Sequence, residues 1–205
     1  MVRQEKIGAQ GQILTILIAV ISIVAYCFPE FSDLLVYERQ SILSGELWRL
    51  FTAPLVHFSK SHLFWDILVF GAAGFAIAAA GFRCFWLVCI FAVSIPSFLF
   101  LFAFPAIERY GGLSALATGA AAYFFLCSAY KSKKNRLIWI CLLAFISIKI
   151  IVEATMGVPL FAQSEKIPFQ VLSSAHILGY LGALITIMWI WPNITLHRTP
   201  KSGRL

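Results

Sequence analysis

The chain carries six long apolar stretches, each close to the length that a helix needs to cross a membrane. The stretches cover residues 12–28, 61–80, 84–103, 113–130, 137–156 and 171–191. A helix of about 20 apolar residues spans the hydrocarbon core of a bilayer. Because 60% of the residues are hydrophobic and only 12% are charged, most of the folded surface must face lipid. We therefore expect an all-α, polytopic membrane protein with six transmembrane helices in one compact bundle.

The six stretches and their short connections use nearly all of the 205 residues. The sequence therefore predicts a single membrane domain over residues 1–205, with its core at about 12–191 and short basic tails at 1–11 and 192–205. The first stretch is expected to be a retained anchor, since no small-x-small cleavage site follows it. The five cysteines lack the spacing typical of metal ligands and are expected to be reduced packing residues.

The positions of lysine and arginine predict the orientation, because cytoplasmic loops carry an excess of both. If the N-terminus is cytoplasmic, ten of these residues lie on the cytoplasmic side: Arg3, Lys6, Arg83, Lys131, Lys133, Lys134, Arg136, Arg198, Lys201 and Arg204. Five lie on the opposite side: Arg39, Arg49, Lys60, Arg109 and Lys166. We therefore expect both termini in the cytoplasm and a multi-pass protein of the bacterial inner (plasma) membrane. The net charge of +7 then reflects contact with anionic lipid, and no nucleic acid is expected as a partner.

A few ionisable side chains lie inside the apolar stretches, where each is costly unless it has a partner or a role. They are His62, Asp66, Lys149, Glu153 and His176. Lys149 and Glu153 are four residues apart and can pair on one face of a helix, so we expect a structural ion pair between them.

The remaining polar residues converge in the expected topology. His62 and Asp66 lie one turn apart near the outer end of the second stretch. Ser114 follows two glycines at the outer end of the fourth, and His176 lies about a turn into the sixth. An imidazole base makes a serine hydroxyl nucleophilic, and free N–H groups at the first turn of a helix favour a developing oxyanion. The pattern predicts acyl transfer, with Ser114 as nucleophile, His176 as base and Gly112, His62 or Asp66 beside the oxyanion.

Each of these residues also has a simpler interpretation. Ser114 can be a helix cap or a small residue at a close helix contact. A single helical histidine such as His176 is often a hydrogen-bonded core residue. His57, His62 and Asp66 contain the i,i+4 spacing of metal ligands, but the chain has no H-E-x-x-H motif, so we expect neither a metal nor a cofactor.

Together, the motifs resemble a known family. Residues 46–52 read Glu-Leu-Trp-Arg-Leu-Phe-Thr and contain Trp48 and Arg49. They are followed by His57, four residues, His62, three residues and Asp66. This region is similar to the Trp-Arg loop and the H-x4-H-x3-N motif of the rhomboid proteases.

Two further motifs carry the same resemblance. Gly112-Leu-Ser114-Ala resembles the G-x-S-G nucleophile motif of the rhomboids, and Ala-His176-Ile-Leu-Gly179 resembles their A-H-x-x-G base motif. The resemblance covers roughly residues 40–190 and implies a Ser114–His176 dyad without a third acid, reached by water from the extracytoplasmic side. It also implies cleavage of transmembrane protein substrates near their extracytoplasmic end, with the fifth helix as the substrate gate.

Among rhomboids, the small six-helix form with Gly-Leu-Ser is most similar to the rhombosortases. That resemblance implies substrates with a C-terminal sorting tail, in which a glycine-rich motif precedes a hydrophobic span and a basic end. Trp48 and Arg49 would belong to a loop that lies partly in the membrane interface. The sequence names neither the substrate nor the oligomeric state.

The chain departs from the family pattern at Asp66, which stands in place of asparagine, at Ala115 in place of glycine, and at Thr118 in place of an aromatic residue. Asp66 can remain protonated and donate to the oxyanion, or it can orient His62. The departures leave two alternatives to a protease. One is an inactive rhomboid-like protein that binds transmembrane helices, and the other is a small transporter that uses Asp66, Lys149 and Glu153 as its polar pathway.

Overall fold

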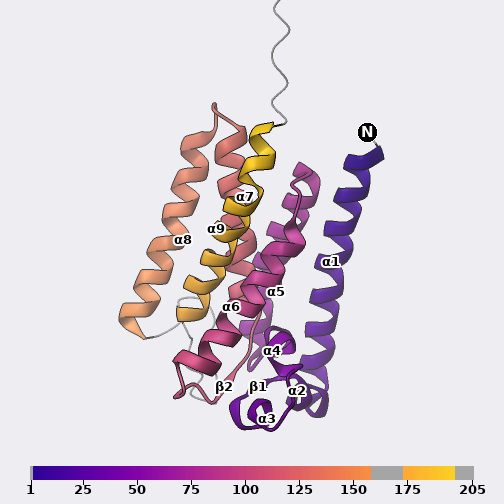
Figure 1. Ribbon diagram of the computed structural model, residues 1–205, viewed down its shortest axis with the longest axis vertical. Helices are drawn as coiled ribbons and strands as arrows, with labels where there is room; N and C mark the ends of the chain where they lie inside the picture. Colours follow the sequence, from indigo (N-terminus) through magenta and orange to yellow (C-terminus); the bar gives the residue numbers. More distant parts are fainter. Residues whose placement is uncertain (1, 158–172, 197–205) are drawn as a thin grey trace, which may run out of the picture.

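The computed structural model describes residues 2–157 and 173–196, with the surroundings of side chains given for 7–157 and 173–190. Long helices run side by side in a bundle, and short elements gather at the end away from the N-terminus (Figure 1). The long helices are α1 (Val2–Cys27), α5 (Lys60–Ala80), α6 (Phe85–Ala103), α7 (Ser114–Lys131), α8 (Arg136–Met156) and α9 (Ser173–Leu196). Each contains most of one predicted apolar stretch, so the helical prediction is confirmed; positions 171 and 172 of the sixth stretch fall outside the described residues.

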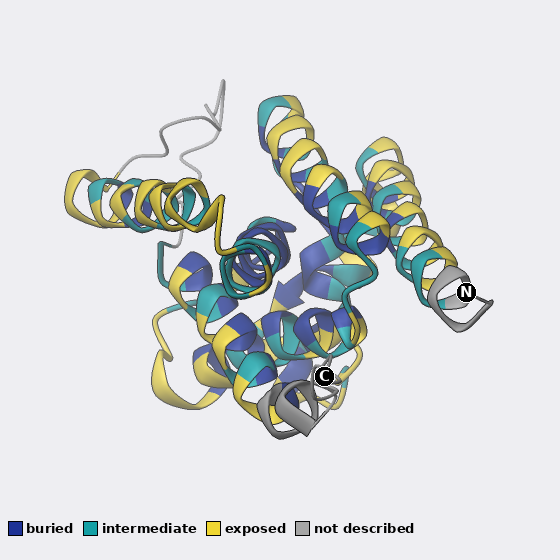
Figure 2. Cartoon of the chain, turned by 90° about the horizontal axis from the view of Figure 1, so that it is seen from above, coloured by how far each residue is buried: buried dark blue, intermediate teal, exposed yellow. Residues whose placement is uncertain are grey.

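Five of these helices are long and apolar enough to cross a membrane. They are Ile7–Cys27 of α1, α5, α6, α8 and Ser173–Ile190 of α9. The outward faces of the helices are exposed while the buried residues face the interior (Figure 2). The exposed residues include large apolar side chains such as Trp86, Ile140 and Met188, which is typical of surface that faces lipid.

Helix α7 is not among the five, although the sequence predicts a span there. It is rich in alanine, and its residues 115–123 are all buried. It packs against α5, α6, α8 and α9. A helix enclosed by other helices has little contact with lipid, and small residues allow its neighbours to approach closely. Hydropathy is therefore a weaker signal for this central helix than for those around it.

The connection between α1 and α5 is folded rather than irregular. It contains α2 (Pro29–Leu35), β1 (Tyr37–Glu38), α3 (Arg39–Leu43), α4 (Arg49–Thr52) and a 3₁₀ turn at Ala53–Leu55. Strand β1 pairs antiparallel with β2 (Arg109–Tyr110), with Tyr37 opposite Tyr110. Because β2 lies just before α7, this pairing ties the connection to the start of α7.

Helices α7 and α9 touch at backbone level. A Cβ atom on Gly179 of α9 would overlap the carbonyl oxygen of Ala115, and one on Gly119 of α7 would come within 2.8 Å of the carbonyl oxygen of Gly179. Ala115 and Ala175 also lie in one buried cluster. The contact brings the start of α7 and the first turns of α9 together.

Replacing Gly179 with alanine is expected to destabilise the bundle, because the carbonyl oxygen of Ala115 is a backbone atom that cannot turn aside. We expect a loss of about 1–3 kcal/mol, the usual cost of overpacking, measured as a lower thermal midpoint in detergent. The matched control is Gly71→Ala on α5, where nothing lies within 4 Å of the added Cβ. An equal drop in both variants would contradict the close approach of α7 and α9.

Candidate active site

Ser114 is the first residue of α7 and is partly exposed. Gly112, two residues earlier, has a φ of +119°, which is unfavourable for residues with a side chain. Its N–H donates to the carbonyl oxygen of Ala53 at 3.3 Å. This turn ends in the free N–H groups of the first turn of α7, where the positive end of the helix dipole also lies.

The turn at residues 111–113, called the Gly112 turn below, lies directly against the imidazole of His62. A Cβ atom on Gly112 would come within 2.5 Å of His62 Cε1 and 2.6 Å of His62 Nε2, and within 3.4 Å of Asp66 Oδ2. His62 lies in the first turn of α5, where its N–H donates to the Ser59 hydroxyl, the N-terminal cap, at 3.1 Å. His62 and Asp66 therefore lie beside the turn that precedes Ser114.

His57, His62 and Asp66 form one buried cluster. Asp66 Oδ2 lies 3.3 Å from His57 Nε2 and 3.2 Å from His62 Nε2, and the two rings meet edge to face at 5.0 Å. Burial lowers the pKa of the His57 imidazole, which favours a neutral ring. Two imidazole nitrogens that face one carboxylate oxygen favour the role in which Asp66 orients the histidines.

The backbone of the Gly112 turn also contacts this cluster. The Leu113 N–H points to His57 Nε2 at 3.4 Å. That nitrogen can accept from Leu113 or donate to Asp66, but not both, so the tautomer of His57 couples the turn to the carboxylate. Among the described residues, no group of three or more His, Cys, Asp or Glu side chains could hold a metal ion.

His176 lies on α9, buried at 4% exposure. Its Nδ1 is 3.1 Å from Oε2 of Glu153 on α8. The same carboxylate oxygen is 2.8 Å from Lys149 Nζ, so the predicted Lys149–Glu153 ion pair is confirmed. The sequence prediction missed the contact between Glu153 and His176. Both residues lie three positions from one end of their helices, at Met156 and Ser173, and a comparison of depth would have matched them.

Ser114 and His176 belong to adjoining helices. Each is next in sequence to one of the two alanines, Ala115 and Ala175, that share a buried cluster. With Gly179 against the Ala115 carbonyl, the two predicted catalytic side chains lie at the same end of the α7–α9 contact. The arrangement can support acyl transfer, since a hydroxyl, an imidazole and the free N–H groups of a helix start occur together.

Trp48 and Arg49 serve the folded connection rather than the Ser114 region. Arg49 is 5% exposed, and its Nη1 donates to the carbonyl oxygens of Asp33 and Val36 at 2.6 and 2.9 Å. Trp48 Nε1 donates to the carbonyl oxygen of Leu34 at 3.0 Å, while its ring is about half exposed. Both side chains fix α4 against α2, which is a structural role.

A comparison with protein families covers this region of the chain. The family model of the rhomboid domain matches residues 44–193, which include every residue of the predicted site. The chain belongs to the rhomboid family. Rhomboids are usually intramembrane serine proteases, although the family includes inactive members. None of the curated proteins compared with this rhomboid matches it.

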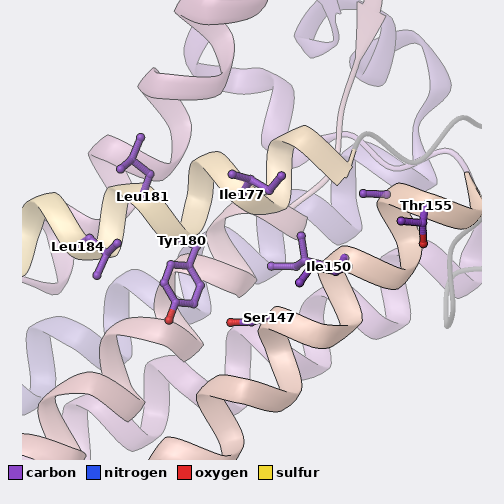
Figure 3. A pocket seen from close by; sticks show the side chains of 9 residues that line it. Ser147, Ile150, Thr155, Ile177, Tyr180, Leu181 and Leu184 are labelled. Atoms are coloured by element: carbon purple, nitrogen blue, oxygen red, sulfur yellow. The ribbon is translucent and has the colours of Figure 1, made fainter.

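The remaining notable feature is an apolar cavity of about 420 Å³ between α8 and α9. Figure 3 shows the side chains around it, which come from both helices. They are Ser147, Ile150, Ile151, Ala154, Thr155, Ile177, Tyr180, Leu181 and Leu184. On α8 the only residues that are buried are Ile150 and Glu153, so most of this helix lies on the surface of the bundle.

Proposed function

We propose that this rhomboid is a serine endopeptidase that cleaves transmembrane protein substrates near their extracytoplasmic end. The observation that carries the proposal is the meeting of α7 and α9, which supports a partnership between Ser114 at the start of α7 and His176 on α9. Lipid surrounds the bundle, and the substrate reaches the site from the bilayer.

The chemistry follows from the groups at this end of the bundle. Ser114 Oγ attacks the carbonyl carbon of the scissile bond while its proton passes to His176. The oxyanion is stabilised by N–H groups of the Gly112 turn and by His62, which Asp66 orients. His176 then protonates the leaving amine, and an acyl-enzyme forms on Ser114. Water, deprotonated by the same imidazole, hydrolyses this ester and restores the serine.

The proposed topology has six spans, with α7 as the enclosed fourth and both termini in the cytoplasm of a bacterial cell. The distribution of lysine and arginine supports it, with ten residues inside and five outside as counted above. The site lies at the end of the bundle opposite the N-terminus (Figure 1). It therefore opens to the extracytoplasmic side of the inner membrane.

The proposed substrates are proteins with a C-terminal sorting tail, as in rhombosortases. The similarity of Gly112-Leu-Ser114 to the motif of that subfamily supports this assignment. The peripheral position of α8, with so few buried residues, supports its role as the substrate gate.

The test is labelling of the purified, detergent-solubilised protein with a fluorophosphonate probe. The Ser114 Oγ–phosphorus bond forms as fluoride leaves, and the hydroxyl proton passes through His176 to solvent. We expect one adduct, mapped by mass spectrometry to the peptide that contains Ser114. No adduct on the wild type, beside an active rhomboid that reacts, would overturn the proposal.

An inactive rhomboid that binds transmembrane helices is the second candidate, because Asp66 stands where the family has asparagine. The two imidazoles around this carboxylate count against it, since they give Asp66 a positioning role in an intact cluster. The transporter alternative has less support, because Asp66, Lys149 and Glu153 are engaged in two separate ionic clusters.

Replacing Asp66 with alanine is expected to slow labelling by about 100-fold, because the histidines lose the carboxylate that orients them and a misplacement of about 1 Å in a catalytic group typically costs about this factor. Asp66→Asn keeps one acceptor oxygen and should retain at least about a tenth of the rate. The measurement is the second-order rate of probe labelling for both variants. Full reactivity of Asp66→Ala would contradict the orienting role, and a faster Asp66→Asn would instead identify an amide donor as the better group.

A further inference from the structure

The second ionic cluster, on α8 and α9, has no part in the mechanism above. We infer that Glu153 is a positioning residue for His176, so that the protein works with a Ser114–His176–Glu153 triad instead of a dyad. The inference rests on the proposed protease function and adds a third group to it.

The geometry of the contact is that of a carboxylate that holds an imidazole. Glu153 Oε2 lies 3.1 Å from His176 Nδ1, and the two side chains are 2% and 5% exposed. The contact joins α8 to α9. Glu153 is the only buried ionisable residue of α8. A carboxylate on the surface of a helix needs no such partner, whereas this one is turned into the bundle.

The contact also sets the tautomer of the imidazole. An ionised carboxylate only accepts hydrogen bonds, so its 3.1 Å contact favours the tautomer in which Nδ1 of His176 carries the proton. Nε2 then keeps its lone pair and is the nitrogen that takes the proton from Ser114. Without the carboxylate, the ring can rotate or adopt the other tautomer, in which Nε2 cannot act as a base.

The charge balance supports the same role. Transfer of the Ser114 proton creates an imidazolium, and the Glu153 carboxylate stabilises it at 3.1 Å. Lys149, 22% exposed, offsets the cost of burying Glu153 in the resting state through its 2.8 Å contact. Its Nζ lies 3.5 Å from Nδ1 and could donate to that nitrogen only in the other tautomer. The shorter 3.1 Å contact with Glu153 favours the tautomer that has the proton on Nδ1.

No other charged group competes for this histidine among the described parts of the helices packed on α9. Helix α6 has no charged residue, and the only one on α7 is Lys131 at its far end. Helix α8 has Arg136 at its far end and then only Lys149 and Glu153. The orientation of His176 therefore depends on α8.

The competing explanation is that Glu153 serves Lys149 alone, as an ion pair within α8. The double variant Lys149→Met/Glu153→Gln distinguishes the two explanations, because it removes both charges of the ion pair and leaves no unpaired charge. It restores function if the pair is only structural, and it does not if the carboxylate positions His176.

The experiment compares fluorophosphonate labelling of the purified full chain as wild type, Glu153→Gln, Glu153→Asp and the double variant, with thermal midpoints measured alongside. We expect Glu153→Gln to lower the maximal labelling rate by about 30-fold or more, since the equivalent loss in a serine–histidine–aspartate triad is larger still. The probe concentration at half-maximal rate should stay within about twofold. Glu153→Asp should regain part of the rate, and the double variant should remain slow while its midpoint matches the wild type.

Wild-type rates in the double variant, or in Glu153→Gln, would overturn the positioning role while leaving the protease proposal intact. A wild type that fails to label would overturn the proposed function, and the triad with it. A shift confined to the half-maximal probe concentration would also count against the inference, because it would indicate an effect on binding rather than on the base.

Discussion

Replacing Ser114 with alanine is expected to abolish labelling and substrate cleavage, and replacing His176 with alanine is expected to lower the labelling rate by about 1,000-fold or more. The serine supplies the only bond to the probe in the proposed mechanism. The imidazole removes its proton, and general base catalysis with an activated nucleophile contributes about this factor. The two changes together should be no worse than Ser114→Ala, because the residues act as one unit. The measurement is in-gel fluorescence of the labelled protein over time.

Ser97→Ala is the matched control for the serine variant. Ser97 is fully buried on α6, and alanine removes the same hydroxyl from a serine of another helix that has no part in the proposed mechanism. Wild-type labelling of Ser97→Ala beside an unlabelled Ser114→Ala would assign the reactive hydroxyl to Ser114. Persistent labelling of Ser114→Ala would mean that another serine reacts, and the proposed mechanism would fail.

Apolar length and composition predicted the helices well, because a segment that crosses a bilayer must be apolar over about 20 residues and must satisfy its backbone hydrogen bonds within a helix. Five of the six predicted stretches meet the length and hydropathy expected of a span, and each of the six is helical over all but at most one of its described residues. Helix α7 is less hydrophobic than a typical span, because it packs in the centre of the bundle against α5, α6, α8 and α9. Sequence could not predict the folded connection before α5, since Arg49 and the β1–β2 pair are held by contacts with distant backbone.

The site was predictable where residues are close in sequence or share a helix. The spacing of His62 and Asp66 placed them on one face, and the Lys149–Glu153 pair followed from the same i,i+4 rule. The contact between Glu153 and His176 crosses from α8 to α9, and spacing along one helix carries no information about it. Only a comparison of depth, measured from the ends of the two helices, could have matched Glu153 with His176.

The burial of these ionisable groups has a common logic. Each would be costly alone in the bilayer, and both clusters place a carboxylate against imidazoles near the start of α7 or α9. In the proposed mechanism, Asp66 orients His62 on the side of the oxyanion and Glu153 orients His176 on the side of the base. Asp66, which replaces the asparagine of the family, and Glu153 would then have the same role. Each carboxylate would orient a histidine on one side of Ser114.

Replacing Gly112 with alanine is expected to lower the labelling rate by about 100-fold or more without unfolding the protein. The new Cβ would lie 2.5 Å from His62 Cε1, so that either the imidazole or the nucleophile turn must move. A shift of about 1 Å in a catalytic group typically costs about this factor. The measurement is the labelling rate together with the thermal midpoint.

Gly45→Ala separates this contact from backbone strain. Gly45 has a φ of +110°, close to the +119° of Gly112, but nothing lies within 4 Å of its added Cβ. Both variants therefore carry a similar strain of about 1–2 kcal/mol, and only Gly112→Ala disturbs His62. Equal, small losses of labelling in the two variants would show that the turn tolerates displacement, and the oxyanion role of His62 would then have to be abandoned. A large loss confined to Gly112→Ala, with both midpoints lowered alike, would tie the reactivity of Ser114 to the imidazole beneath its turn.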